Sequence, residues 1–332
     1  MQLSPDTLRK ALEQYGLPFG SVIAIAKGYR NTSHLIELEN STRINLIVYK
    51  SESGIQDRIR RTNQLASIFT ATPLPVREPI DTRLSVFRVN DRVFHISIYN
   101  YLPGHTIPWE AYTMKHIKLL GWAIGEFHKR ARSFTGQLPS VSDEYFEHIR
   151  EMSRYFSDPN VVSAMHRKLG IAPNIPFDAL AKTVTSLSSL PHQQALHLDF
   201  VRGNILFDEA RPGDMLQLGN VTVSGILDLE KASYGHPVWD VARSLGFLLV
   251  DCPKPADKIF RYFIQSGYRK RADQTIALPF LNEALNIFLI YDFYKFLRDN
   301  PYESLAQNHH YQRTRDILTK IGMLYLIGKQ ER

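Results

Sequence analysis

The chain has 332 residues, 44% of them hydrophobic and 22% charged, and its formal net charge is +7 at pH 7. This length suits two lobes better than one small domain, and the composition is that of an ordinary globular protein. The one cysteine, Cys252, excludes an internal disulfide framework and a cysteine-rich zinc site. We therefore expect a reducing, cytoplasmic environment.

The N-terminal residues lack the basic and apolar regions of a signal peptide. No apolar run reaches the roughly 18 residues that would span a bilayer, so no membrane segment is expected. A positive charge balance can suit nucleic acid, a membrane surface or a polyphosphate ligand. Because no nucleic-acid motif is found, neither a nucleic-acid nor a membrane partner is expected.

The first part of the chain alternates short apolar segments with turn formers, which indicates a small β-sheet. A helix is predicted to begin at Ser4, because Ser4-Pro5-Asp6 combines an N-cap, a first-turn proline and an acid at the positive end. Strands are then expected over 22–26, 34–38 and 44–50, a helix over 55–69, and a β-hairpin over 84–89 and 93–98.

The rest of the chain is predicted to be mainly helical. Apolar residues recur at spacings of three and four over 113–130, which predicts a helix there. Further helices are expected over 239–249, 259–267 and 281–297. The last of these carries Phe288, Tyr291 and Tyr294, which either pack in the core or line a cage for a cationic substrate.

Polar residues with metal-binding chemistry gather between His197 and Asp228. Asn204 follows Asp199 and leads into a short apolar strand, while a second strand ends directly on Asp228. Turn formers separate the two strands, so a hairpin would bring Asp199, Asn204 and Asp228 to one end. Two carboxylates and an amide oxygen suit Mg²⁺ held against phosphate oxygens.

This stretch resembles the aminoglycoside phosphotransferase and choline kinase superfamily. Residues 197–206, HLDFVRGNIL, are similar to its H-G-D-x-x-x-x-N-I-L pattern, and Asp228-Leu229-Glu230 followed by residues 235–242, GHPVWDVA, is similar to its second motif. The resemblance implies an α+β, two-lobed, protein-kinase-like fold. Its N-lobe, a small antiparallel sheet with one helix, would span 1–98, its hinge 99–104 and its larger helical C-lobe 105–332.

The resemblance also implies roles for the motif residues. Asp199 would accept the proton of the acceptor hydroxyl, and Asn204 and Asp228 would hold Mg²⁺. Lys50, at the end of the third expected strand, would bind the nucleotide phosphates. Glu230 would reach the metal directly or through a water.

Three further motif residues would have supporting roles by the same resemblance. His197 would orient the catalytic loop through hydrogen bonds, and Asp240 would brace that loop from below. Arg202 is either a surface residue or a group that binds phosphate or an anionic substrate. Leu198 departs from the glycine that is usual at its position.

The nucleotide would be contacted by two segments. Residues 28–33 form a loop that would lie over the phosphates with Tyr29, Asn31 and Ser33 as donors, although a plain hairpin turn explains the same residues. The backbone of Tyr99 and Tyr101 would bind the adenine edge. The helix over 55–69 offers only Asp57 as a partner for Lys50; otherwise the lysine is held differently.

We therefore expect an enzyme that moves the γ-phosphate of ATP, with Mg²⁺, to a hydroxyl of a small molecule. Amino alcohols, hydroxy amino acids, sugars and aminoglycosides are the candidate acceptors. The alternatives are a protein kinase, which the short stretch from Asp228 to Asp240 disfavours, and a non-catalytic nucleotide-binding protein on the same fold. The sequence leaves the oligomeric state open.

Overall fold

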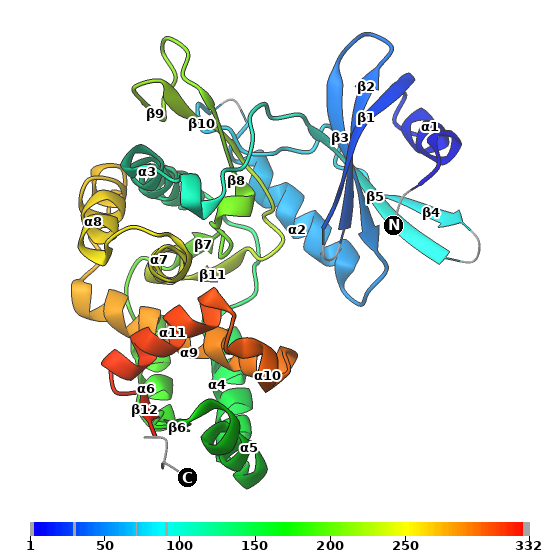
Figure 1. The fold of residues 1–332 in the computed structure, drawn as a ribbon. Coiled ribbons are helices and arrows are strands. Elements are labelled where there is room, and N and C mark those ends of the chain that lie inside the picture. The colour runs from blue at the N-terminus through cyan, green and yellow to red at the C-terminus, as the bar shows by residue number, and fades with distance from the viewer. Residues whose placement is uncertain (1–2, 29–30, 71, 90–91, 328–332) are drawn as a thin grey trace. The chain divides into compact units, whose positions relative to one another are not determined.

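The computed structural model describes residues 3–28, 31–70, 72–89 and 92–327 (Figure 1). The chain divides into two compact units. Unit 1 contains Met1–Thr106, Ser133–Gln137 and Gly203–Glu230, and unit 2 contains Ile107–Arg132, Leu138–Arg202 and Lys231–Arg332. The chain thus returns to unit 1 after the first catalytic motif. The lobe boundaries expected from the sequence stay a prediction.

Unit 1 is built on a five-stranded antiparallel sheet in the order β1-β2-β3-β5-β4, together with a three-stranded sheet in the order β8-β10-β9. Its elements are α1 (Pro5–Glu13), β1 (Phe19–Lys27), β2 (Asn31–Leu38), β3 (Arg43–Lys50), α2 (Ile55–Ser67), β4 (Ser85–Val89), β5 (Arg92–Asn100), β8 (Ile205–Glu209), β9 (Gln217–Leu218) and β10 (Val221–Ile226). The predicted helices and both predicted hairpins of this unit are confirmed.

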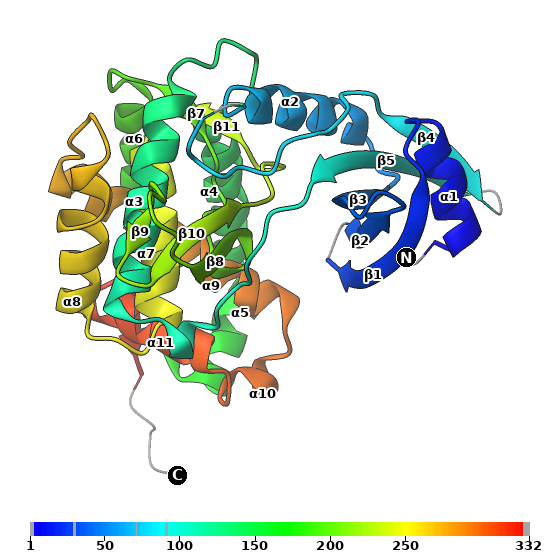
Figure 2. The ribbon, with the colours of Figure 1, turned by 90° about the horizontal axis from the view of Figure 1, so that it is seen from above.

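The five-stranded sheet is covered on both faces. Strand β3 explains why, because its residues alternate between two apolar clusters. Leu46 and Val48 belong to the cluster that contains Leu8 and Leu12 of α1. Ile47 and Tyr49 belong to the cluster that contains Ile55 and Ile59 of α2. The two helices therefore pack on opposite faces of the sheet (Figure 2).

Unit 2 is mainly helical, with two short antiparallel strand pairs, β7–β11 and β6–β12. Its elements are η1 (Trp109–Ala111), α3 (Met114–Ala131), α4 (Val141–Ser157), α5 (Pro159–Ala164), η2 (Met165–Leu169), β6 (Ile171–Pro173), α6 (Phe177–Ser188), β7 (Gln194–Leu196), β11 (Ser233–Gly235), α7 (Val238–Asp251), α8 (Ala256–Phe260), η4 (Arg261–Gln265), η5 (Tyr268–Lys270), α9 (Leu278–Asp299), α10 (Tyr302–Leu305), α11 (His309–Lys320) and β12 (Leu324–Leu326). A further short helix, η3 (Arg202–Asn204), spans the boundary between the units.

Helix α7 is held at the centre of unit 2 by close packing. Its Trp239 is buried and stacks on Tyr145 of α4 with ring centroids 4.3 Å apart. Its Gly246 faces α9, where an added Cβ would lie 2.4 Å from the ring of Phe288. This packing sets the position of the polar residues in the first turns of α7. None of the helices in the described part of the chain is long and apolar enough to cross a membrane.

Candidate active site

The carboxylate of Asp240, on α7, organises the stretch that contains Asp199. It accepts the backbone N–H of His197 at 2.8 Å and that of Leu198 at 2.5 Å. It also pairs with His128 of α3 at 2.9 Å. Burial alone would raise the pKa of Asp240, but the hydrogen bond and charge of His128 outweigh it and hold the pKa below its ordinary value. Asp240 therefore braces the loop as an ionised, buried group.

His197 fixes the next step of this loop. Its ring is fully buried between Phe127 and Phe200, at centroid distances of 5.6 and 4.4 Å. Its Nδ1 accepts the backbone N–H of Asp199 at 3.1 Å, so His197 acts on the loop backbone. Between them Leu198 takes a φ of 55°, a left-handed conformation that costs a non-glycine residue about 1–2 kcal/mol.

Two cations contact the carboxylate of Asp199. Lys231 Nζ lies 2.8 Å and Arg243 Nη2 3.3 Å from the same oxygen, Oδ1. Burial raises the pKa of Asp199, but the positive charges of Lys231 and Arg243 outweigh burial and leave the pKa below its ordinary value. Asp199 is therefore ionised at neutral pH and remains partly accessible, with 14% of its side chain exposed.

Arg202 is exposed and lies apart from this arrangement of cations. It lines a cavity of about 430 Å³ with Trp109, Glu110, Asp251 and His310. Adjacency in sequence suggested Arg202 as the cation beside Asp199, whereas the structure places Lys231 and Arg243 on the Asp199 carboxylate. The sequence did contain a signal for Arg243, since it follows Asp240 by one helical turn and so shares its face of α7.

Oxygen-bearing side chains gather in unit 1 after β10. The backbone N–H of Leu227 donates to the carbonyl of Asn204 at 2.9 Å, so Asn204 and Asp228 occupy neighbouring strand ends. Asp228 takes a φ of 58°, and its carboxylate accepts the backbone N–H of Glu230 at 3.2 Å. Glu230 in turn accepts the side-chain N–H of Asn31 at 2.9 Å.

These residues fit a divalent cation. Burial raises the pKa of Glu230 to about 7, and the negative charge of Asp228 adds to that shift. Two carboxylates that repel each other in this way are stabilised by a bound cation, and with the amide oxygen of Asn204 they form a hard-oxygen donor set. No group of three or more His, Cys, Asp or Glu that could hold a metal occurs among the described residues. The donor set of two carboxylates and one amide lies below that number.

The expected loop over 28–33 is shorter than predicted. Asn31 and Ser33 belong to β2 and pair with Tyr49 and Ile47 of β3. The Ser33 hydroxyl lies 3.5 Å from the Asn45 Oδ1 atom. Tyr29 lies outside the described residues. Of the three expected phosphate donors, Asn31 is the one whose side chain reaches another predicted site residue, Glu230.

Lys50 ends β3, as the resemblance implies. Asp57, its expected partner, lies on the exposed face of α2 and pairs with Arg60 at 3.2 Å, with 68% of its side chain exposed. Asp57 and Arg60 are three residues apart in one helix, which places both side chains on the same face. Glu52 pairs with Arg58. The structure thus provides no support for the role expected of Asp57.

The Tyr99 side chain lies in the core, which corrects the expectation that this residue is available to a nucleotide. Its hydroxyl contacts the hydroxyl of Tyr49 at 2.9 Å and donates to Asn63 at 3.0 Å. Its backbone pairs with Asn45 of β3. Tyr101, by contrast, follows the end of β5 and is partly exposed.

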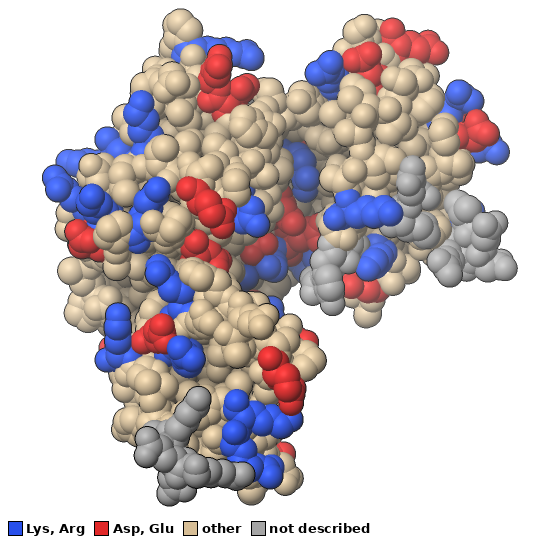
Figure 3. Space-filling model, in the orientation of Figure 1, with Lys and Arg blue, Asp and Glu red and all other residues tan. Residues whose placement is uncertain are grey.

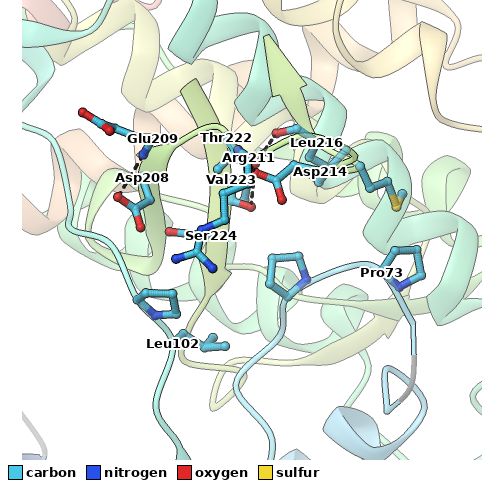
Figure 4. A pocket seen from close by; sticks show the side chains of 13 residues that line it. Pro73, Leu102, Asp208, Glu209, Arg211, Asp214, Leu216, Thr222, Val223 and Ser224 are labelled. Atoms are coloured by element: carbon cyan, nitrogen blue, oxygen red, sulfur yellow. Dashed lines mark hydrogen bonds between the residues drawn. The ribbon is translucent and has the colours of Figure 1, made fainter. Parts of the chain in front are cut away.

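One cavity of about 250 Å³ lies within unit 1, next to the turn after β8 (Figure 4). Its lining includes Leu102 and several acids of that turn. Asp208 accepts the backbone N–H of Glu209 at 2.8 Å, and Asp214 accepts that of Arg211 at 2.6 Å. These acids stabilise the turn, and none of the predicted site residues lines the cavity.

Charged side chains of both signs are interspersed on the face of unit 2 that Figure 3 shows. Several make ion pairs, such as Lys168 with Glu303 and Arg315 with Asp316, each at 2.7–2.8 Å. A mixed surface of this kind differs from the positive stripe that binds nucleic acid through its phosphates.

Comparisons with known proteins agree with this arrangement. The model of the phosphotransferase enzyme family matches residues 21–273, about three quarters of the chain. No curated protein sequence matches. Among solved structures, amicoumacin kinase hAmiN superposes with a TM-score of 0.67 at 13% identity, covering 95% of this chain and 93% of that one.

Two other solved structures have the same fold. A microcompartment-associated aminopropanol kinase has a TM-score of 0.66 at 16% identity, covering 96% of this chain and 99% of that one. Macrolide 2'-phosphotransferase MphH from Brachybacterium faecium has a TM-score of 0.57 at 14% identity, covering 98% and 99%. The α+β, protein-kinase-like fold is therefore shown, and the chain belongs to the phosphotransferase enzyme family.

Proposed function

We propose that this protein transfers the γ-phosphate of ATP to a hydroxyl group of a small molecule. The observation that carries the proposal is Asp199, an ionised carboxylate at the end of a loop that Asp240 and His197 hold by three backbone hydrogen bonds. Phosphoryl transfer depends mainly on positioning and charge stabilisation, and a rigid carboxylate provides positioning.

Asp199 would orient the acceptor hydroxyl and take its proton. As the hydroxyl oxygen bonds to the γ-phosphorus, the bond from that phosphorus to the ADP oxygen breaks and the proton moves to Asp199. A carboxylate whose pKa lies below its ordinary value is a weak base. The proton is therefore transferred late, when the hydroxyl oxygen has already lost electron density to phosphorus.

Asn204 and Asp228 would hold the divalent metal, with Glu230 beside them. A bound metal would bridge the phosphate oxygens and neutralise their charge. Among similar folds, hAmiN was solved with AMP-PNP and Ca²⁺, and a spectinomycin phosphotransferase with ADP and spectinomycin. These complexes support a nucleotide and a small acceptor for this chain as well.

The adenine would bind to the segment that follows β5. Within the described residues, no hydrogen bond engages the backbone N–H of Tyr101 or Leu102. The N–H groups on either side, of Asn100 and His105, are bonded to Glu78 and Phe207. A short stretch of free donors between two fixed points suits recognition of a planar base edge. Lys50 would contact the phosphates.

The test is ADP formation from MgATP with amino alcohols, hydroxy amino acids, sugars and aminoglycosides as acceptors. Wild type would be compared with Asp199→Asn and with Asp178→Asn, which alters an exposed acid in the first turn of α6. We expect Asp199→Asn to lower kcat by about 10²–10⁴-fold with little change in the KM for ATP, and the control to match wild type. Full activity in Asp199→Asn, or absence of MgATP binding in wild type, would refute the proposal.

A further inference from the structure

The surroundings of Asp199 within unit 2 carry information about the acceptor. Asp199 provides one negative charge, and Lys231 and Arg243 both contact its Oδ1 atom. The three groups together keep one positive charge in excess. Arg243 is largely buried, with 17% of its side chain exposed, and its Nε atom has no hydrogen-bond partner among the described residues.

The other carboxylates that act on Arg243 already have partners. Glu144 and Asp292 both contribute to its electrostatic surroundings. Glu144 is hydrogen-bonded by His148 at 3.3 Å, and Asp292 by His310 at 2.5 Å. These two acids are therefore committed to histidines, and the Asp199 carboxylate is the one that Arg243 and Lys231 share.

A third cation, Lys295 of α9, belongs to the same neighbourhood. It is exposed, and no ion pair within the described part of the chain involves it. Burial of its amine lowers the pKa of Lys295, and the positive charges of Arg243 and Lys231 lower it further. Three cations that repel one another around one carboxylate leave a position that favours an anion.

The aromatic residues of α9 are not available as a cage for a cationic substrate. Each lies against a cation of the chain itself. Lys295 lies 5.9 Å from the ring centre of Tyr291, Arg298 lies 5.2 Å from that of Tyr294, and Arg243 lies 5.5 Å from that of Phe288. A substrate ammonium group would compete with these fixed charges and be repelled by them.

We propose that the acceptor carries an anionic group, a carboxylate or a phosphate, beside the hydroxyl that it presents to Asp199, and that Arg243 and Lys231 bind this anion. The inference rests on the proposed phosphotransferase activity. An arginine offers a planar fork that matches carboxylate and phosphate oxygens. The polycationic aminoglycosides are then poor acceptors, because the site would repel them.

The experiment compares acceptors that differ in charge alone. ADP formation from MgATP would be measured with 3-hydroxypropionate, 3-hydroxypropanamide and 3-amino-1-propanol, which carry a carboxylate, an amide and an ammonium group on the same carbon chain. Glycerate, glycerol 3-phosphate and glycerol form a second series that separates carboxylate from phosphate. We expect the best anionic acceptor to exceed its neutral and cationic counterparts by about tenfold or more in kcat/KM.

Variants test the residues. Arg243→Gln should raise the KM for the anionic acceptor by about tenfold or more and leave the KM for ATP unchanged, while Arg243→Lys should recover part of the loss. Arg150→Gln removes an exposed arginine of α4 that pairs with Glu147 and should behave as wild type. Should Arg243→Gln fail to fold in a thermal melt, Lys295→Gln provides the second measurement, with a smaller rise in the same KM.

The outcomes separate this inference from the proposed function. Binding of a fluorescent ATP analogue and slow ATP hydrolysis in water report on the nucleotide site alone. If both are present but the best acceptor is neutral or cationic, or no anionic acceptor raises ADP formation above hydrolysis in water, the inference is wrong and the phosphotransferase proposal survives. If the nucleotide does not bind, both fail. An unchanged selectivity in Arg243→Gln would also overturn the role given to that residue.

Discussion

The carboxylate of Asp240 accepts the backbone N–H of His197 at 2.8 Å, although the two residues are 43 positions apart in the chain. A side chain on a helix thereby sets the backbone geometry of the loop that ends in Asp199. Because the contact is buried and charge-assisted, it is stronger than a neutral hydrogen bond and depends on both the charge and the position of Asp240.

Asp240→Asn should destabilise unit 2 by about 3 kcal/mol, because it removes one partner of a buried, hydrogen-bonded ion pair with His128. Urea denaturation followed by circular dichroism measures the change. As a control, Asp273→Asn alters an acid that is 42% exposed and pairs with Arg132. That substitution should cost no more than about 1 kcal/mol. Equal stability of the two variants would contradict the bracing role.

Asp199 should stay ionised well into the acidic range. Burial works against this, but the charges of Lys231 and Arg243 lower its pKa. Removing Lys231 takes away a positive charge, so Lys231→Met should raise the pKa of Asp199 and move the acidic limb of the kcat/KM profile to higher pH. Lys258→Met, on the exposed side of α8, is the matched control. An acidic limb that does not move in Lys231→Met would show that Asp199 does not set it.

His310 connects three helices of unit 2 in a pH-dependent way. Its ring contacts Asp251 of α7 at 2.6 Å and Asp292 of α9 at 2.5 Å, and Phe296 stacks on it. Burial alone would lower the pKa of His310, but the two carboxylates outweigh it and raise the value to about 9. The folded state therefore binds this proton more tightly than the unfolded chain does.

The sign of the effect follows from linkage. With a folded-state pKa above the unfolded value of about 6.5, the contribution of His310 is complete below that pH and is lost as the pH rises through about 9. It amounts to about 3 kcal/mol. The difference in unfolding free energy between wild type and His310→Gln should thus shrink from pH 6 to pH 10. A difference that stays constant over this range would exclude a charged His310 as the link.

Tyr99→Phe should lower stability by about 1 kcal/mol, because it leaves Tyr49 and Asn63 without a hydroxyl partner inside the core of unit 1. It should leave the KM for ATP unchanged, since the Tyr99 side chain points into that core and its backbone belongs to the sheet. Thermal melts and steady-state kinetics measure the two effects. A marked rise in the KM for ATP would return Tyr99 to the nucleotide site.

The sequence by itself determined the local elements and the order of the motif. Ser4-Pro5-Asp6 predicted the start of α1, the periodicity over 113–130 predicted α3 to within one residue, and both hairpins formed at their predicted positions. Local structure is readable because capping, periodicity and turn chemistry act between residues close in the chain. The spacing from His197 to Asp228 and the block at 235–242 likewise predicted the family.

Only the tertiary structure decided which charges meet. Arg202 is adjacent to the catalytic loop in sequence, yet Lys231 and Arg243 contact Asp199. Asp57 pairs along its own helix with Arg60. Such contacts are set by the packing of helices, strands and loops distant in sequence, because a charged side chain is directed by the rotation of its helix and the path of its loop. Neither quantity is written in the spacing of a motif.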